Sequence, residues 1–213
     1  MKEAVILANG NFPTHPYPLQ VLKKAAFLVC CDGAANNLLN TGQEPDVIIG
    51  DLDSISQDIL EENSSRILHK PDQESNDLTK AVRFCRSKGY NKLRIVGATG
   101  KREDHTIGNM GLLARYAQQG HVEMITDHEI LTVIYGKGDV KTQPGQQVSF
   151  FNTTAGVPVT ASNVKYPVTN LLLDQWWQGT LNEATGTSIS LHAPGATLIV
   201  FLLYADTNSP FSR

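Results

Sequence analysis

The sequence has little cysteine, and the few cysteines form no recognisable pattern. Cys30, Cys31 and Cys85 are odd in number, and their spacing matches no metal site. They fit free thiols in a reducing cytosol, so we expect a cytoplasmic protein.

Long apolar runs and clusters of positive charge are also missing. No apolar run approaches the roughly 18 residues of a membrane span, and the N-terminus lacks the apolar segment of a signal peptide. The formal net charge is −3, and no run of lysine and arginine would suit a phosphate backbone or an anionic membrane. We therefore expect neither nucleic acid nor a membrane among the partners. What remains is the composition of a soluble globule, 41% hydrophobic and 18% charged.

The first part of the chain alternates short apolar strands with helices. Between residues 78 and 85, for example, apolar side chains recur three and four positions apart, which predicts a helix. This alternation is typical of a parallel α/β sheet, so we assign residues 1–136 to an N-terminal, Rossmann-like domain. Its last expected strand is 130–135. Segment 13–18 contains three prolines and is expected to be a loop.

The pattern changes at Gly136-Lys137-Gly138, after which helical periodicity disappears. Short apolar strands such as 196–203 alternate with turns at Pro144-Gly145 and Pro194-Gly195. Short strands separated by such turns predict a small antiparallel β-sandwich over residues 137–213.

One acidic segment, Gly50-Asp51-Leu52-Asp53-Ser54, directly follows the apolar strand 47–49. The carboxyl ends of strands are where open α/β sheets bind ligands. If the chain is still extended here, Asp51 and Asp53 face the same side. Two carboxylates roughly 4 Å apart repel by about 4 kcal/mol at an effective dielectric of 20. Mg²⁺ removes that penalty, and the alternative is a solvated acidic turn.

Three further segments suit phosphate groups. Asp32-Gly33 lies between a strand and a helix, where backbone N–H groups approach phosphates, although Asp32 can instead cap that helix. Between a later strand and helix, two glycines precede Lys101-Arg102, with Asp104 placed to orient Arg102 or to cap the helix. Asp77 and Lys80 lie one helical turn apart, which a helix dipole with a lysine neighbour also explains.

Five segments in this order resemble the thiamine pyrophosphokinase (thiamine diphosphokinase) family. The resemblance covers nearly the whole chain, including the order of an α/β half and a β half. The segments are Cys31-Asp32-Gly33-Ala34-Ala35-Asn36, residues 45–54, residues 72–80, residues 97–105 and Asn163-Val164-Lys165-Tyr166-Pro167.

The resemblance implies that a pyrophosphoryl group passes from ATP to the hydroxyl of thiamine, giving thiamine diphosphate and AMP. It also implies a homodimer whose thiamine sites lie between the α/β domain of one subunit and the β domain of the other. By position, Asp51, Asp53 and Asp77 match the Mg²⁺-holding carboxylates. The nucleotide side is matched by Asp32, Lys80, Arg102 and Asp104, and the thiamine side by Gln73, Tyr166, Thr187 and Ser188.

The chain departs from the family pattern at Ala34, which replaces a common glycine and only narrows the first loop, and at two places in the β half. Ile189 stands where the family usually has Asn, which puts contacts from that corner in question. An extra segment before Gly186 carries Trp176-Trp177. These indoles could face the thiazolium cation, which is worth about 0.5–2 kcal/mol. The alternatives are a place in the core of the β domain or a dimer contact.

Two other functions share parts of this residue set. Another ATP-dependent pyrophosphokinase, for instance one acting on a pterin, needs the acidic cluster but not Gln73, Tyr166 and Ser188. A non-catalytic sensor of thiamine or nucleotide tolerates the loss of a metal carboxylate. The sequence identifies no general base and assigns no role to His105 or Asp127.

Overall fold

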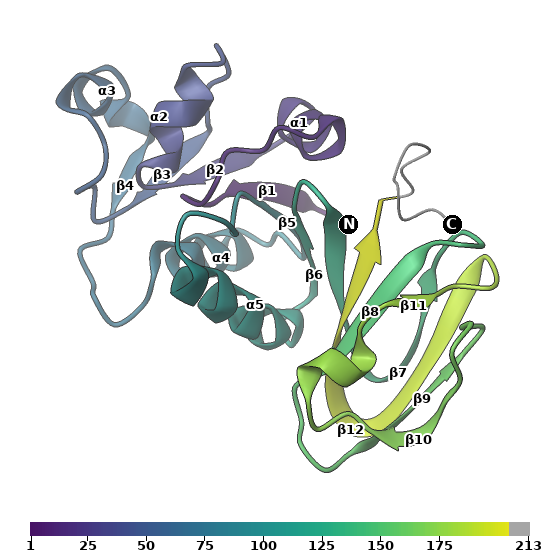
Figure 1. The fold of residues 1–213 in the computed structure, drawn as a ribbon. Coiled ribbons are helices and arrows are strands. Elements are labelled where there is room, and N and C mark those ends of the chain that lie inside the picture. The colour runs from purple at the N-terminus through teal and green to yellow at the C-terminus, as the bar shows by residue number, and fades with distance from the viewer. Residues whose placement is uncertain (205–213) are drawn as a thin grey trace. The chain divides into compact units, whose positions relative to one another are not determined.

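The computed structural model describes residues 1–204 and divides the chain into two compact units, Met1–Asp127 and His128–Arg213 (Figure 1). This division lies ahead of the boundary expected after residue 136. The strand expected at 130–135 belongs to the second unit, because it is part of a longer strand that pairs with the last strand of the chain. None of the described helices is long and apolar enough to span a membrane.

The first unit is built on a parallel sheet, as expected for an α/β domain. The strand order is β6-β5-β1-β2-β3-β4, and each neighbouring pair is parallel. The order reverses beside β1, which is where doubly wound sheets bind ligands. The strands are β1 (Glu3–Leu7), β2 (Leu28–Cys31), β3 (Val47–Gly50), β4 (Ile67–His69), β5 (Lys92–Val96) and β6 (His121–Ile125).

Helices cover both faces of this sheet. In Figure 1, α4 and α5 lie on one side, and α1 and α2 on the other. The sequence predicted that a helix begins near Asn76, and α4 begins there. Asn76 caps α4, and its side chain accepts a hydrogen bond from the Thr79 N–H at 2.9 Å. The helices are α1 (Pro16–Lys23), α2 (Ala34–Leu39), α3 (Gln57–Glu62), α4 (Asp77–Ser87) and α5 (Glu103–Ala117), with a 3-10 helix, η1 (Ser64–Arg66).

The prediction of a loop over 13–18 was wrong, since α1 begins at Pro16. Proline is tolerated in the first turn of a helix because its missing N–H would have no partner there. His15 caps the helix, and its Nδ1 accepts from the Tyr17 N–H at 3.2 Å.

The second unit is an antiparallel β structure organised by one long strand, β12 (Ser188–Leu203). This strand pairs with β7 (Glu129–Lys141) along its length. It also pairs with β9 (Pro158–Ser162) in its first part and β8 (Gln147–Asn152) in its second. Also present are β10 (Val168–Leu172) beside β9, β11 (Asn182–Glu183) beside β8, and the 3-10 helix η2 (Trp176–Gly179).

The glycines that predicted a boundary and a turn lie instead at a bend inside these two long strands. The pairing of β7 with β12 is irregular between Ala193 and Thr197, next to Gly195 and opposite Gly136, and both glycines have positive φ. Glycine commonly marks such a bulge or bend. The prediction of a turn at Pro194-Gly195 between short strands was therefore wrong.

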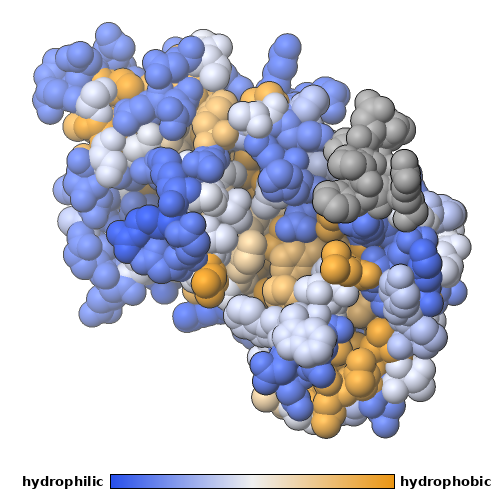
Figure 2. All heavy atoms as spheres, in the orientation of Figure 1, coloured by the Kyte–Doolittle hydropathy of each residue, from blue (hydrophilic) through white to orange (hydrophobic). Residues whose placement is uncertain are grey.

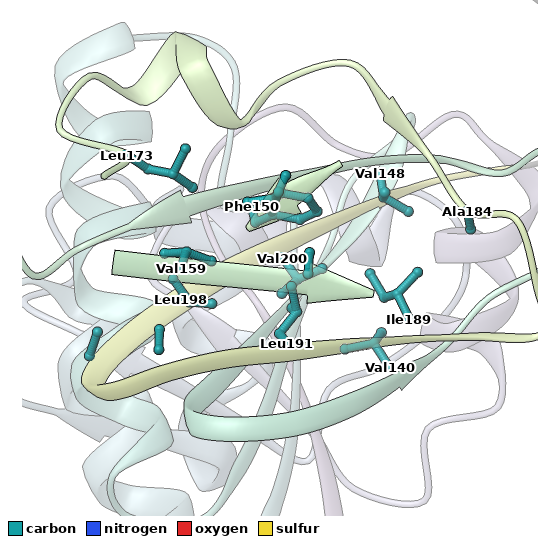
Figure 3. Close-up of a cluster of buried hydrophobic side chains, with 14 residues drawn as sticks. Val140, Val148, Phe150, Val159, Leu173, Ala184, Ile189, Leu191, Leu198 and Val200 are labelled. Atoms are coloured by element: carbon teal, nitrogen blue, oxygen red, sulfur yellow. The ribbon is translucent and has the colours of Figure 1, made fainter. Parts of the chain in front are cut away.

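The core of the second unit lies where the two parts of β12 turn toward each other (Figure 3). Along β12, Ile189 and Leu191 are buried, whereas Ser188 and Ser190 are only partly covered. This alternation follows from the two-residue period of a strand. Figure 2 shows hydrophobic residues reaching the surface of this unit near η2 and β10.

Candidate active site

A cavity of about 540 Å³ opens at the carboxyl ends of β1, β2, β3 and β5 in the first unit. We call it the strand-end cavity. It collects most of the predicted metal and phosphate residues, because parallel strands end at one edge of the sheet. Its polar lining comprises Asn9, Asp32, Asp51, Asp53, Ser54, Asn76, Asp77, Lys101, Arg102, Asp104, His105 and Asn109.

Three carboxylates converge in this cavity. One oxygen each from Asp32, Asp51 and Asp53 lies within 4.8 Å of the others. The chain is not extended between Asp51 and Asp53, because β3 ends at Gly50 and Leu52 has a φ of 69°. The expected proximity of the two carboxylates is thus present, but a turn produces it rather than strand alternation.

Asp32 is the buried member of this group. Only 3% of its surface is exposed, its φ is 44°, and its Oδ1 atom is buried without a hydrogen-bond partner among the described residues. Burial raises the pKa of its carboxyl, although the Ser54 hydroxyl and the Gly33 backbone act in the opposite direction. The N-cap residue of α2 is Gly33, which has no side chain to cap the helix, and the Asp32 side chain lines the cavity.

Asp51 is held by Gln73, whose Nε2 donates to Asp51 Oδ2 at 3.0 Å. This hydrogen bond is the main cause that lowers the pKa of Asp51. Gln73 was predicted from the family resemblance as a thiamine-side residue, and the structure places it against a predicted metal carboxylate.

Asp77 and Lys80 form the expected pair at the start of α4. Lys80 Nζ donates to Asp77 Oδ1 at 2.9 Å, and Lys80 is buried. Asp77 lines the strand-end cavity but is not among the three converging carboxylates. It lies beside Asp32 at Gly50, where an added Cβ would be 3.3 Å from Asp77 Cγ and 2.8 Å from Asp32 Cβ.

The loop after β5 supplies the cations of the cavity. The Arg102 guanidinium forks onto Asp104, with Nη2 2.5 Å from Oδ2 and Nε 3.1 Å from Oδ1. That hydrogen bonding lowers the pKa of Asp104 to about 2. Asp104 therefore orients Arg102, and its Oδ1 also accepts from the His105 N–H at 2.8 Å in the first turn of α5.

Sequence reasoning missed three asparagines that hold the loops of this cavity together. Lys101 Nζ donates to Asn9 Oδ1 at 2.9 Å. Asn109 Nδ2 donates to the Ala98 carbonyl at 2.9 Å, and Asn76 Nδ2 donates to Asn109 Oδ1 at 3.2 Å. Asparagine carries no charge, so the charge pattern gave no signal for these contacts.

The remaining predicted residues belong to the second unit. Tyr166 is 57% exposed, and its backbone N–H and carbonyl bond the side chain of Asn182 at 3.1 and 2.8 Å. The Thr187 carbonyl accepts from the Thr142 N–H at 2.9 Å, and the Ser188 carbonyl accepts from Asn163 Nδ2 at 3.0 Å. These hydrogen bonds hold the backbones of Tyr166, Thr187 and Ser188 in place. Tyr166 itself remains exposed.

The two departures from the family pattern in the β half differ in how deeply the second unit buries them. Ile189 is fully buried in the core of the second unit, so the residue type there acts through packing. Trp176 and Trp177 are 56% and 72% exposed, and Trp176 stacks on Phe151 with ring centroids 5.6 Å apart. The core alternative for the tryptophans was therefore wrong, and the thiazolium and dimer alternatives stay predictions.

Comparisons with known proteins cover both units. Residues 19–125 match the family described as thiamin pyrophosphokinase, catalytic domain, and residues 130–201 match thiamin pyrophosphokinase, substrate-binding domain. The fold and cavity thus define a two-domain protein, with an α/β domain that carries the strand-end cavity and a β-rich second domain. The chain belongs to the thiamin pyrophosphokinase family.

Individual relatives support this placement. The chain is 30% identical to thiamin pyrophosphokinase 1 of Caenorhabditis elegans over 125 residues, which cover 54% of this chain and 51% of the relative. It is 26% identical to thiamine pyrophosphokinase of Bacillus subtilis over 178 residues, 80% of this chain and 83% of the relative. The chain spans about half the length of the worm and Arabidopsis thaliana relatives that it matches, 51% in each case.

Solved structures share the fold. The crystal structure of thiamine pyrophosphokinase from Bacillus subtilis has a TM-score of 0.82 at 21% identity and covers 96% of this chain and 100% of its own. The yeast thiamin pyrophosphokinase structure has a TM-score of 0.78 at 19% identity and covers 97% of this chain and 88% of its own. Both have the two-domain fold expected from the sequence.

Proposed function

We propose that this protein is a thiamine diphosphokinase, which transfers a pyrophosphoryl group from ATP to the hydroxyl of thiamine and releases AMP. The observation that carries the proposal is the strand-end cavity, where carboxylates and the cations Lys101 and Arg102 line one space in a chain of this family. Such a combination suits a polyphosphate with its metal ion.

The carboxylates fit a hard divalent cation. Their oxygens lie within 4.8 Å of one another, and the buried Oδ1 of Asp32 has no partner among the described residues. Asp51, Asp53 and Asp77 would hold Mg²⁺ in this proposal. The ion would neutralise charge on the phosphate oxygens.

The cationic side chains act on the phosphate chain. In-line attack on the β-phosphorus builds charge on oxygens, so positioning and electrostatics supply most of the catalysis. Arg102, oriented by Asp104, and Lys80, oriented by Asp77, stabilise charge on the transferred group and on the departing AMP. Asp32 lines the same cavity and is assigned to the nucleotide side in this proposal.

Thiamine needs residues that contact its two rings, in addition to the site for the phosphates. In this proposal it binds between Gln73 of one subunit and Tyr166, Thr187 and Ser188 of another, within a homodimer. The exposed Tyr166 ring is available to stack on a thiamine ring. The three cysteines are buried free thiols, which suits the cytoplasmic setting proposed here.

The alternatives are less well supported. The family matches favour neither a pterin pyrophosphokinase nor a sensor, and all the metal carboxylates are present. A sensor would bind thiamine or nucleotide without turnover, so turnover separates it from the enzyme.

The deciding experiment is an assay for AMP formed from ATP, with and without thiamine and with a pterin alcohol as the competing acceptor. Thiamine-dependent AMP release supports the proposal. Asp51→Asn should lower turnover by at least about 10²-fold without unfolding the chain, because it removes a metal ligand and little packing. Release of AMP with the pterin alone, or binding without turnover, would contradict the proposal.

A further inference from the structure

Asn9 lies at the point where the strand order of the parallel sheet reverses. It follows the end of β1 and lines the strand-end cavity. The backbone on either side of it is held by the end of β5 and the loop that follows. The Ala8 N–H donates to the Val96 carbonyl at 2.8 Å, and the Gly10 N–H donates to the Gly97 carbonyl at 2.7 Å. The Asn9 side chain therefore starts from a fixed backbone at the edge of the cavity.

Lys101 determines which way the amide of Asn9 faces. Lys101 Nζ donates to Asn9 Oδ1 at 2.9 Å. An ammonium group only donates hydrogen bonds, so the atom that it contacts must be the amide oxygen and not the amide nitrogen. The two N–H bonds of Asn9 Nδ2 are consequently on the other side of the amide.

Asn9 Nδ2 lies beside Gly33, in the loop after β2. A Cβ on Gly33 would be 2.8 Å from Asn9 Nδ2 and 2.9 Å from the Ser54 carbonyl oxygen, so glycine leaves space at this nitrogen. Asn9 is exposed, and none of the residues within 1–204 accepts a hydrogen bond from its Nδ2. Its N–H bonds are therefore available to a ligand in the cavity.

The neighbouring charges indicate what kind of ligand this is. Asn9 Nδ2 and the Lys101 ammonium only donate, and they lie at the two ends of one hydrogen-bonded pair in the cavity. Donors of this kind suit anionic oxygens, because hydrogen bonds to ionised acceptors are shorter and stronger than neutral ones. A phosphate chain offers several such oxygens within the span of one pair.

We infer that Asn9 is a phosphate-binding residue, whose Nδ2 donates to the phosphate chain of the nucleotide while its Oδ1 holds Lys101 beside the same chain. The inference rests on the proposed function for the identity of the ligand. It deepens that function by adding an uncharged contact on the nucleotide, at the end of β1.

The test measures calorimetric binding of α,β-methylene-ATP with Mg²⁺, an analogue that lacks the P–O–P bond broken in the proposed reaction. Asn9→Ala should weaken binding at least about 10-fold, since a hydrogen bond to a charged group is lost. Lys101→Met removes the ammonium and keeps a side chain of similar length. In the Lys101→Met background, Asn9→Ala should still weaken binding at least about 5-fold, because the contact from Nδ2 does not depend on Lys101.

Asn9→Asp is the second variant, because it keeps the shape of the side chain and an oxygen for Lys101 but replaces the donor by an acceptor. It should bind the analogue more weakly than Asn9→Ala does. Asn91→Ala is the matched control and should bind as the unchanged protein does, since Asn91 is exposed and precedes β5 at the opposite end of that strand from the cavity. Thermal unfolding of each variant checks that the fold is kept.

Two results would show that Asn9 acts only through Lys101 and would overturn the inference. One is an Asn9→Ala change without effect in the Lys101→Met background, and the other is normal binding by Asn9→Asp. Either result together with thiamine-dependent AMP release would leave the proposed function standing. Failure of the unchanged protein to bind the analogue would overturn both.

Discussion

Gly50 and Asp32 approach so closely that a Cβ on Gly50 would lie 2.8 Å from the Cβ of Asp32. Real Cβ contacts are essentially never this short, and the neighbouring atom belongs to a buried side chain that cannot move aside freely. The end of β3 therefore requires glycine for packing against the end of β2, independently of any metal.

Gly50→Ala is expected to push Asp32 out of the carboxylate group and to lower turnover. Gly111→Ala is the matched control, because Gly111 is within α5 and an added Cβ meets nothing within 4 Å. Replacing a helical glycine in this way stabilises a protein by roughly 0.5–1 kcal/mol. Thermal unfolding and the AMP assay on both variants check the prediction, which fails if Gly50→Ala retains full turnover.

Arg102→Ala should lower kcat more than it raises the thiamine KM, since the partner of Arg102 is the phosphate chain. Asp104→Asn should have a smaller effect in the same direction, because the guanidinium loses its orientation but not its charge. Steady-state kinetics with varied thiamine separate the two parameters. A change confined to the thiamine KM would place Arg102 at the acceptor side instead.

The effect of Asp104→Asn should also be independent of pH between about 5 and 8. The folded pKa of Asp104 is depressed to about 2, so its ion pair with Arg102 is present above the ordinary pKa of 3.8 and is lost only as pH falls through about 2. Kinetic profiles of the variant and the unchanged protein should therefore run parallel over this range. A difference that develops between pH 5 and 7 would assign the lost interaction to another titrating group.

Mixing two inactive chains should restore activity if thiamine sites are shared between subunits. One chain carries Asp51→Asn, and the other carries Tyr166→Ala with Ser188→Ala. A heterodimer of the two has one intact site, so up to about half of the activity of that dimer population should return. Homodimers of each variant are the controls. No recovery in a heterodimer verified by mass spectrometry would mean that each site is built from one chain.

The three thiols should resist alkylation in the folded protein. Burial raises the pKa of Cys85 to about 12, and it also raises the pKa of Cys30 and Cys31 well above its usual range, so almost no thiolate exists at pH 8. Iodoacetamide at pH 8 should leave the native protein unmodified and label all three cysteines after unfolding, as read by mass spectrometry. Ser65→Cys, at an exposed position, is the positive control and should react at once.

Local patterns predicted much of the first unit. The β-branched run before Asp51 and the apolar stripe of α4 are signals within a few residues, and the structure has both elements where they were expected. Pro16 misled the prediction because the same residue that breaks a helix interior is favoured in a first turn. Only His15, an uncommon N-cap residue, marked the start of a helix at Pro16.

Relations across the fold were not predictable in the same way. Asp32 joins Asp51 and Asp53 only through the register of β2 on β3, and register is a property of two distant segments. Gly136 marked a change of composition, yet whether a glycine separates domains or bends a strand depends on the partner strand, here β12. The exposure of Trp176 likewise depends on what packs beside it.

The long strand β12 has a consequence for the order in which the protein forms. It is the last described strand of the chain, and β7, β8 and β9 all pair with it. A growing chain can complete the first unit while these strands still lack their common partner, since domains fold as units during synthesis. The pairings of β12 join residues far apart in sequence, so they close late and slowly. Thr187 and Ser188, at the start of β12, are therefore among the last residues to be set in place.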